Sequence, residues 1–93
     1  MIKYKFEPEN NRVAAYLEDG KEVGKLTFIP NCDVWDADHT FVDADHRGGT
    51  IAGDMLKLLV DTARAEGKLI HPSCPYVAKV MDKVSEYQDI LKR

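Results

Sequence analysis

The segment that most constrains the fold is residues 43–52, where an extended run gives way to a glycine turn and then to a long amphipathic run. Before it, Trp35, Ala37, His39 and Phe41 alternate with Asp36, Asp38 and Thr40, which is the period of a strand with two unlike faces. After it, apolar residues recur at helical spacing over residues 51–63. A strand, a tight turn and a helix N-terminus bring unpaired backbone N–H groups to the positive end of the helix dipole. The segment therefore predicts an anion-binding site.

Four extended segments precede or lead into this turn and predict an antiparallel meander. They are residues 2–6, 12–17, 23–29 and 34–42. Turn formers separate them: Pro8 with the asparagines that follow it, the Asp19-Gly20 pair of a tight hairpin, and a break over residues 30–33. Alternation places Val23 on the face opposite Leu26, and it places His39 on the face of Trp35 as a core histidine.

The second half of the chain predicts two helices around one short strand. The first helix covers residues 50–66, and Gly67 stands just past its end. Residues 68–71 form a fifth strand, which should lie parallel to the fourth because a helix connects them. Residues 76–84 form a shorter helix, and residues 85–91 form a last strand or a helical turn. This order predicts an α+β fold with a mixed, mainly antiparallel sheet and one β-α-β crossover.

Length and charge restrict the classes of function. The 93 residues predict one domain, residues 1–93, with a single core. A net charge of −3 argues against a nucleic-acid binder that works through bulk electrostatics. No apolar run has the ~20 residues of a membrane span, and the first residues lack the apolar stretch of a signal peptide. We therefore expect no nucleic-acid partner, no membrane, a monomer or weak dimer, and a cytoplasmic location.

The cysteines and histidines do not predict a disulfide or a metal site. Cys32 and Cys74 stand in a chain without an export signal, where free thiols are the rule. The possible ligands show no compact spacing, so we expect no zinc; they are Cys32, His39, His46, His71 and Cys74.

Four stretches of the chain resemble the GNAT acetyltransferase superfamily, and within it a short single-domain subgroup that contains little beyond the CoA site. The superfamily motif at the turn is Gln/Arg-x-x-Gly-x-Gly/Ala, and residues 47–52 here read Arg-Gly-Gly-Thr-Ile-Ala. The other matching stretches are residues 38–42, 73–79 and 86–90. Four stretches in the right order are far more specific than a single glycine turn.

The resemblance implies a GNAT-like acyl-CoA fold with acetyl-CoA as co-substrate and no metal. The backbone of Phe41, Val42 and Asp43 would pair with the pantetheine arm of the cofactor. The backbone amides that would hold its pyrophosphate are those of Arg47, Gly48, Gly49, Thr50, Ile51 and Ala52. The fourth and fifth strands would splay apart to admit the cofactor and an amine acceptor. Cys74 matches the cysteine that the subgroup offers as its candidate catalytic residue.

Thr50 departs from the motif, which has glycine at this position. A β-branched residue resists the positive φ that glycine tolerates, which predicts a loop of different shape or a lost amide contact. The Thr50 hydroxyl would alternatively cap the helix or bond to a phosphate oxygen. Without the resemblance, Gly48 and Gly49 would be explained simply as a turn between a strand and a helix.

Each remaining candidate side chain has a structural and a functional explanation. Cys74 is either a small buried apolar residue or a thiol that acts as an acid, a base or an acyl acceptor. His39 is a core histidine or a general base. The sequence therefore predicts a minimal N-acetyltransferase, with a CoA-binding module of little or no transfer activity as the alternative. A protein-interaction domain that keeps the fold but has lost the ligand is a third hypothesis.

Overall fold

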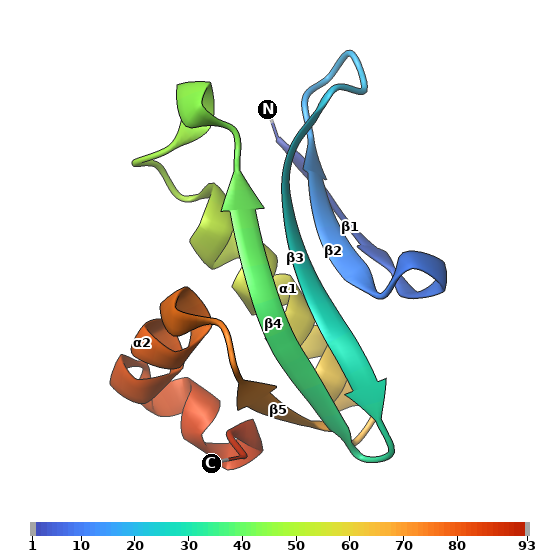
Figure 1. Ribbon diagram of the computed structural model, residues 1–93, viewed down its shortest axis with the longest axis vertical. Helices are drawn as coiled ribbons and strands as arrows, with labels where there is room; N and C mark the ends of the chain where they lie inside the picture. The colour runs from blue at the N-terminus through green and yellow to red at the C-terminus, as the bar shows by residue number, and fades with distance from the viewer. Residues whose placement is uncertain (1, 93) are drawn as a thin grey trace.

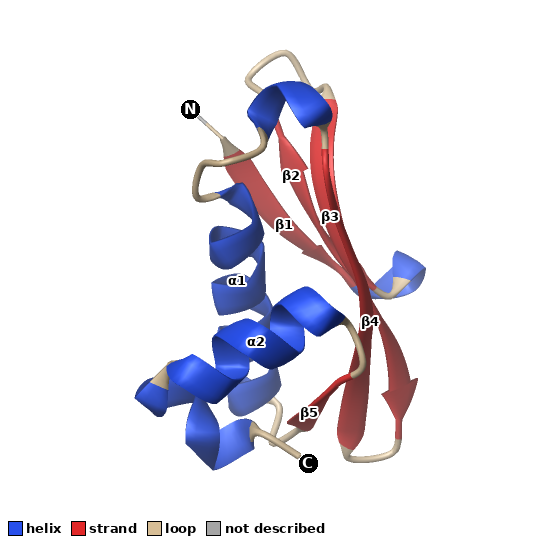
Figure 2. Ribbon diagram, turned by 60° about the vertical axis from the view of Figure 1, so that its left-hand side comes forward, coloured by secondary structure: helices blue, strands red, loops and turns tan. Residues whose placement is uncertain are grey.

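The computed structural model describes residues 2–92, which form a five-stranded sheet with both α-helices on one face (Figures 1 and 2). The strands lie in the order in which they occur in the chain. They are β1 (Lys3–Glu7), β2 (Arg12–Tyr16), β3 (Glu22–Asn31), β4 (Val34–Val42) and β5 (Leu69–Pro72). Neighbouring strands are antiparallel from β1 to β4, and β5 is parallel to β4. The predicted α+β fold with one parallel crossover is confirmed.

The helices lie close to their predicted positions. They are α1 (Ile51–Ala65) and α2 (Pro75–Lys83), with the 3-10 turns η1 (Pro8–Asn10), η2 (Ala44–His46) and η3 (Ser85–Ile90). Gly67 follows α1 with φ +71°, a conformation that glycine adopts without strain. Of the two alternatives for residues 85–91, the helical turn is confirmed, because η3 occupies this segment. One bridge between Leu91 and Ile70 continues the sheet beyond β5.

The core lies between the sheet and α1. The helix buries one apolar face, because its apolar residues recur every three or four positions: Met55, Leu56, Leu59, Val60 and Ala63. Stacked rings of Phe6, Phe28 and Trp35 from β1, β3 and β4 fill another part of the core, with centroids 4.7–5.8 Å apart. Within residues 2–92, neither α-helix covers the opposite face of the sheet, and Figure 2 shows both of them on one side of the strands.

Two β-bulges overturn the predicted alternation. Ala15 pairs with Gly24 and Tyr16 pairs with Glu22, which leaves Val23 as the extra residue of β3. The Val23 side chain is buried at 1% exposure in the same core as Leu26, and not on an opposite face. In β4, Thr27 pairs with His39 and Phe28 pairs with Ala37, which leaves Asp38 as the extra residue. An extra residue moves every later side chain to the other face. His39 is therefore exposed, and the prediction of a core histidine is wrong.

The predicted break at residues 30–33 is shorter than expected, because β3 continues through Pro30 to Asn31. The Phe28 N–H bonds to the Asn11 carbonyl on the β2 side, 2.9 Å away. Pro30 lies two residues further on and faces the same edge, beyond the start of β2 at Arg12. A missing N–H at an unpaired edge costs no ladder hydrogen bond, which explains why proline is tolerated there.

Candidate functional site

The strands β4 and β5 pair over four residues and then separate. Pairing runs from Val34 with Leu69 to Ala37 with Pro72. The last backbone contact is the Cys74 N–H, which donates to the Ala37 carbonyl at 2.8 Å. Within the described residues, β4 therefore has no strand partner on its β5 side from Asp38 to Val42. The bulge at Asp38 coincides with the point of separation, so the predicted splay is present.

The space beside residues 38–42 of β4, where β5 no longer pairs, is the opening. Backbone groups of β4 face the opening at alternate residues. The Asp43 N–H donates to the Val23 carbonyl of β3 at 2.8 Å. Because backbone groups point alternately to the two sides of a strand, those of Thr40 and Val42 point away from β3 and into the opening. The backbone groups of Phe41 and Asp43 face β3, and the Phe41 side chain is 44% exposed on the open face of the sheet. Among the three predicted pantetheine contacts, Val42 turns its backbone toward the opening; its carbonyl accepts from the Arg47 Nε at 2.8 Å, so its N–H is the group with the geometry for main-chain pairing.

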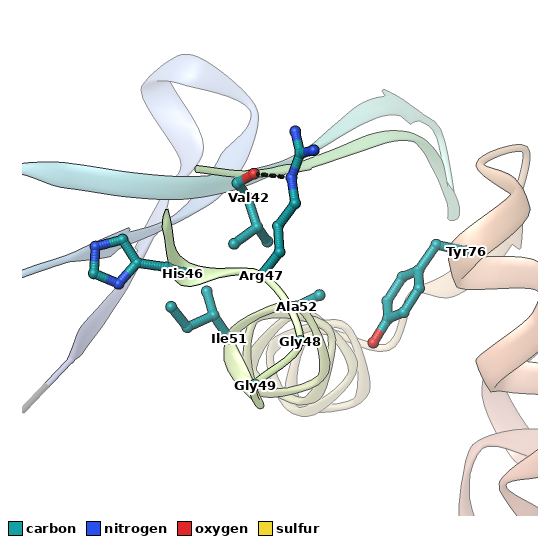
Figure 3. A pocket seen from close by; sticks show the side chains of 8 residues that line it. All are labelled: Val42, His46, Arg47, Gly48, Gly49, Ile51, Ala52 and Tyr76. Atoms are coloured by element: carbon teal, nitrogen blue, oxygen red, sulfur yellow. Dashed lines mark hydrogen bonds between the residues drawn. The ribbon is translucent and has the colours of Figure 1, made fainter. Parts of the chain in front are cut away.

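A hollow of about 300 Å³ continues from the opening to the glycine turn (Figure 3). Its lining comes from the end of β4, the turn, the first turn of α1 and the start of α2, and consists of Val42, His46, Arg47, Gly48, Gly49, Ile51, Ala52 and Tyr76. Six of these are predicted cofactor-binding residues. The other four predicted site residues, Phe41, Asp43, Thr50 and Cys74, are not part of this lining.

The turn presents backbone rather than side chains. Gly48 has φ +85°, the left-handed region that favours glycine, and a Cβ atom at Gly49 would have no neighbour within 4 Å. Thr50 has φ −102°, so its position does not need a glycine and the expected backbone conflict is absent. No side chain caps the helix at Thr50, which leaves the first N–H groups of α1 directed at the hollow.

The acidic side chains near the turn are held away from the hollow. The Thr50 hydroxyl donates to the Asp54 carboxylate at 3.1 Å instead of capping the helix, and the Tyr4 hydroxyl donates to the same oxygen at 2.9 Å. Asp54 thereby faces β1 and lines a separate surface depression with Tyr4. The Asp43 carboxylate accepts from the Asp45 N–H at 3.2 Å. These contacts leave His46 and Arg47 as the ionisable side chains that line the hollow besides the Tyr76 phenol.

Cys74 lies at the inner end of the opening, as the residue before α2. It is 5% exposed, and its Sγ is 3.4 Å from the Thr40 Oγ1 across the opening. Cys32 is exposed in the turn after β3, and both thiols are free, as predicted. Within residues 2–92, no group of three or more His, Cys, Asp and Glu side chains is placed to hold a metal ion.

His46 and Tyr76 line the hollow but were not predicted from the sequence. Tyr76 lies in the stretch 73–79 that matches the superfamily, and an aromatic residue at the start of a helix after Pro75 was the available signal. Burial raises the pKa of Tyr76 above its usual 10.0, so its phenol is protonated and can donate a hydrogen bond at neutral pH.

The comparison with known families agrees with this geometry. The sequence profile described as GCN5-related N-acetyltransferase matches residues 12–90, which is most of the chain. The chain belongs to the GCN5-related N-acetyltransferase (GNAT) family. The match begins at β2 and includes the β4–α1 turn and both helices of this GNAT protein.

Solved GNAT structures have the same fold. A GCN5-like candidate N-acetyltransferase from Staphylococcus aureus superposes with a TM-score of 0.77 at 22% identity, covering 97% of this chain and 87% of that one. The ribosomal-protein-alanine N-acetyltransferase of Brucella melitensis biovar Abortus 2308 has a TM-score of 0.58 at 23% identity, covering 78% of this chain and 59% of that one. No curated protein sequence matches the chain. Within residues 2–92, no helix is long and apolar enough to span a membrane.

Proposed function

We propose that this GNAT protein binds acetyl-CoA and transfers its acetyl group to an amine. The observation that supports this most is the opening between β4 and β5, which leads from Cys74 and Thr40 to the hollow at the glycine turn. The pyrophosphate would bind the backbone N–H groups of residues 47–52, where close approach is possible and the helix dipole is favourable. The pantetheine arm would lie along β4 beside Val42.

In the proposed reaction, the nitrogen of a neutral amine attacks the thioester carbonyl carbon. The C–S bond breaks, CoA leaves as a thiolate that takes up a proton, and the new amide nitrogen loses one. Backbone N–H groups of β4 that face the opening would stabilise the negative charge that develops on the carbonyl oxygen. Such fixed donors need no reorganisation during the reaction, which is why they are effective.

Cys74 is the proposed catalytic residue, because it is the thiol at the inner end of the opening. It would either exchange a proton with the leaving CoA sulfur or accept the acetyl group before the amine does. In the second case the enzyme carries an acetylated Cys74, and mass spectrometry after mixing with acetyl-CoA would detect the added acetyl group. In the first case the thiol stays unmodified.

Binding and transfer are tested separately. Thermal shift with acetyl-CoA and with CoA tests binding, and no shift at about millimolar ligand would contradict any CoA-dependent role. Release of free CoA thiol in the presence of protein N-termini, lysine and small amines tests transfer. We expect Cys74→Ala to lower kcat by about a hundredfold or more, as for the loss of a proton-transfer group. The matched variant Cys32→Ala, which removes the exposed cysteine, should leave kcat unchanged.

The second candidate is a CoA-binding module without transfer activity. The burial of Cys74, at 5% exposure, favours it, because a thiol enclosed by protein has limited access to a substrate. A thermal shift with CoA, combined with no thiol release for any amine in the panel, would support this function over transfer.

A further inference from the structure

Thr40 and Cys74 meet at the point where the two strands have separated. The residues lie 34 positions apart in sequence, and their side-chain atoms Oγ1 and Sγ are 3.4 Å apart. The backbone of Cys74 is fixed independently, since its N–H donates to the Ala37 carbonyl at 2.8 Å. The position of the Cys74 sulfur is therefore set both by its hydrogen-bonded backbone and by its contact with the Thr40 hydroxyl of β4.

The hydroxyl of Thr40 stands in apolar surroundings. Its cross-strand partner is Leu26, which is fully buried, and Val42 is the next residue along β4 on the same face. A valine would match this environment in shape without a polar group to satisfy. Among the hydrogen bonds of residues 2–92, the Thr40 hydroxyl pairs with the Cys74 sulfur. Because Thr is branched at Cβ, its side-chain rotation is restricted and the oxygen is held at a defined place.

We infer that Thr40 is the positioning residue for the Cys74 thiol, an inference that rests on the proposed function. A hydroxyl both donates and accepts, so it can accept the S–H of the thiol and donate its own O–H to the thiolate. The contact therefore persists in both protonation states of the sulfur, with only hydrogens rearranged. Thr40 orients the sulfur through this contact, and Cys74 remains the group that meets the substrate.

The test uses the full chain with Cys32→Ser, so that Cys74 is the remaining thiol. Thr40→Val removes the hydroxyl at nearly constant shape, and Thr40→Ser keeps it. We expect Thr40→Val to slow alkylation of Cys74 by iodoacetamide about tenfold at a fixed neutral pH, the effect of losing a modest hydrogen bond to a charged atom. Thr40→Ser should restore the rate to within about twofold of the parent.

Steady-state kinetics provide the second readout. We expect Thr40→Val to lower kcat for acetyl transfer about tenfold while KM for acetyl-CoA stays within about twofold, because the hydroxyl acts on the sulfur and not on the cofactor. Thr40→Ser should again recover most of kcat. Circular dichroism and the unfolding temperature verify that each variant is folded. If Thr40→Val does not fold, Thr40→Ala replaces it with the same expected losses.

The outcomes separate this inference from the proposed function. Slower alkylation in Thr40→Val with recovery in Thr40→Ser supports the positioning role even if the parent protein transfers no acetyl group. Equal alkylation rates and equal kcat in a folded Thr40→Val or Thr40→Ala variant would overturn the role, while transfer by the parent would leave the proposed function intact.

Discussion

The Nε of Arg47 donates a hydrogen bond of 2.8 Å to the carbonyl oxygen of Val42, so the residue that begins the glycine turn folds back onto the end of β4. The guanidinium also lies 5.9 Å from the centroid of the Phe41 ring. The contact occupies the Val42 carbonyl that faces the opening, and it fixes a positive charge beside the hollow (Figure 3). This hydrogen bond thus joins the end of β4 to the start of the glycine turn.

Replacement of Arg47 should weaken CoA binding without unfolding the protein. Arg47 is exposed, so its loss removes a charge and a hydrogen bond but little packing. We expect Arg47→Ala to raise the Kd for CoA about three- to tenfold, the effect of one exposed charge-assisted contact. Isothermal titration calorimetry measures it. Lys3→Ala removes the same charge from β1 as a control, and an equal loss in both variants would assign the effect to net charge alone.

The two glycines of the turn should respond differently to alanine. Gly48 has φ +85°, so Gly48→Ala should cost about 1–2 kcal/mol of unfolding free energy through backbone strain. Gly49 has no positive φ and no neighbour near its missing Cβ, so Gly49→Ala should change stability by less than about 0.5 kcal/mol. Its methyl group would still obstruct a phosphate at the turn. Urea unfolding measures the free energy of unfolding of each variant, and titration with CoA measures its affinity. Unaltered CoA affinity in Gly49→Ala would argue against phosphate contact there.

Gly24 on β3 lies beneath side chains of α1 and leaves little room for a Cβ atom. A Cβ atom there would lie 3.2 Å from the Phe41 carbonyl oxygen, 3.2 Å from Met55 Cε and 3.3 Å from Ile51 Cγ2. We expect Gly24→Ala to destabilise the fold by about 1–3 kcal/mol, the usual cost of overpacking, and to displace the first turn of α1. Urea unfolding measures the loss.

Gly53→Ala is the matched control, because its Cβ would meet the Tyr76 hydroxyl at an ordinary 3.6 Å. Alanine is the better helix former by about 1 kcal/mol, so this variant should be neutral or more stable. A destabilised Gly53→Ala together with a neutral Gly24→Ala would contradict this close packing of α1 on β3.

The Tyr4 hydroxyl should make stability depend on alkaline pH. Burial, and then the hydrogen bond to the negatively charged Asp54, raise the pKa of Tyr4 to about 12. A pKa above the usual value of 10.0 means that the folded state holds the proton more tightly. The stabilisation is complete below pH 10.0 and is lost as the pH rises through about 12. Tyr4→Phe should therefore show a flatter fall of the urea midpoint over this range than the parent, and parallel curves would contradict the assignment.

The sequence predicts the order of elements well, because hydrophobic periods and turn residues act locally. It predicts Val34–Val42 as a strand at its observed bounds, and it predicts Gly67 at the end of α1. It does not predict the bulge at Asp38, because an extra residue in one strand depends on how the neighbouring strand pairs. The exposed position of His39 follows from that bulge, and so does the start of the opening.

Part of the site was predictable because it is formed by residues that are close together in the sequence. The glycine turn is a local feature, and its residues do line the hollow, with the exception of Thr50. Tyr76 reaches the hollow from α2, which is brought there by the separation of β4 and β5. The partner of the Thr50 hydroxyl, Asp54, is one helical turn away, whereas Tyr4 reaches the same carboxylate from the edge strand β1, 50 positions away in sequence. Contacts between distant segments need the fold.

Amide chemical shifts during a titration with acetyl-CoA report the position of the cofactor residue by residue, so they test whether it binds along β4 and at the glycine turn. We expect saturable shifts concentrated at Val42, Gly48, Gly49, Ile51 and Ala52, with the amides of β1 unchanged. Saturable shifts confined to other surfaces, or no shifts at about millimolar acetyl-CoA, would contradict it.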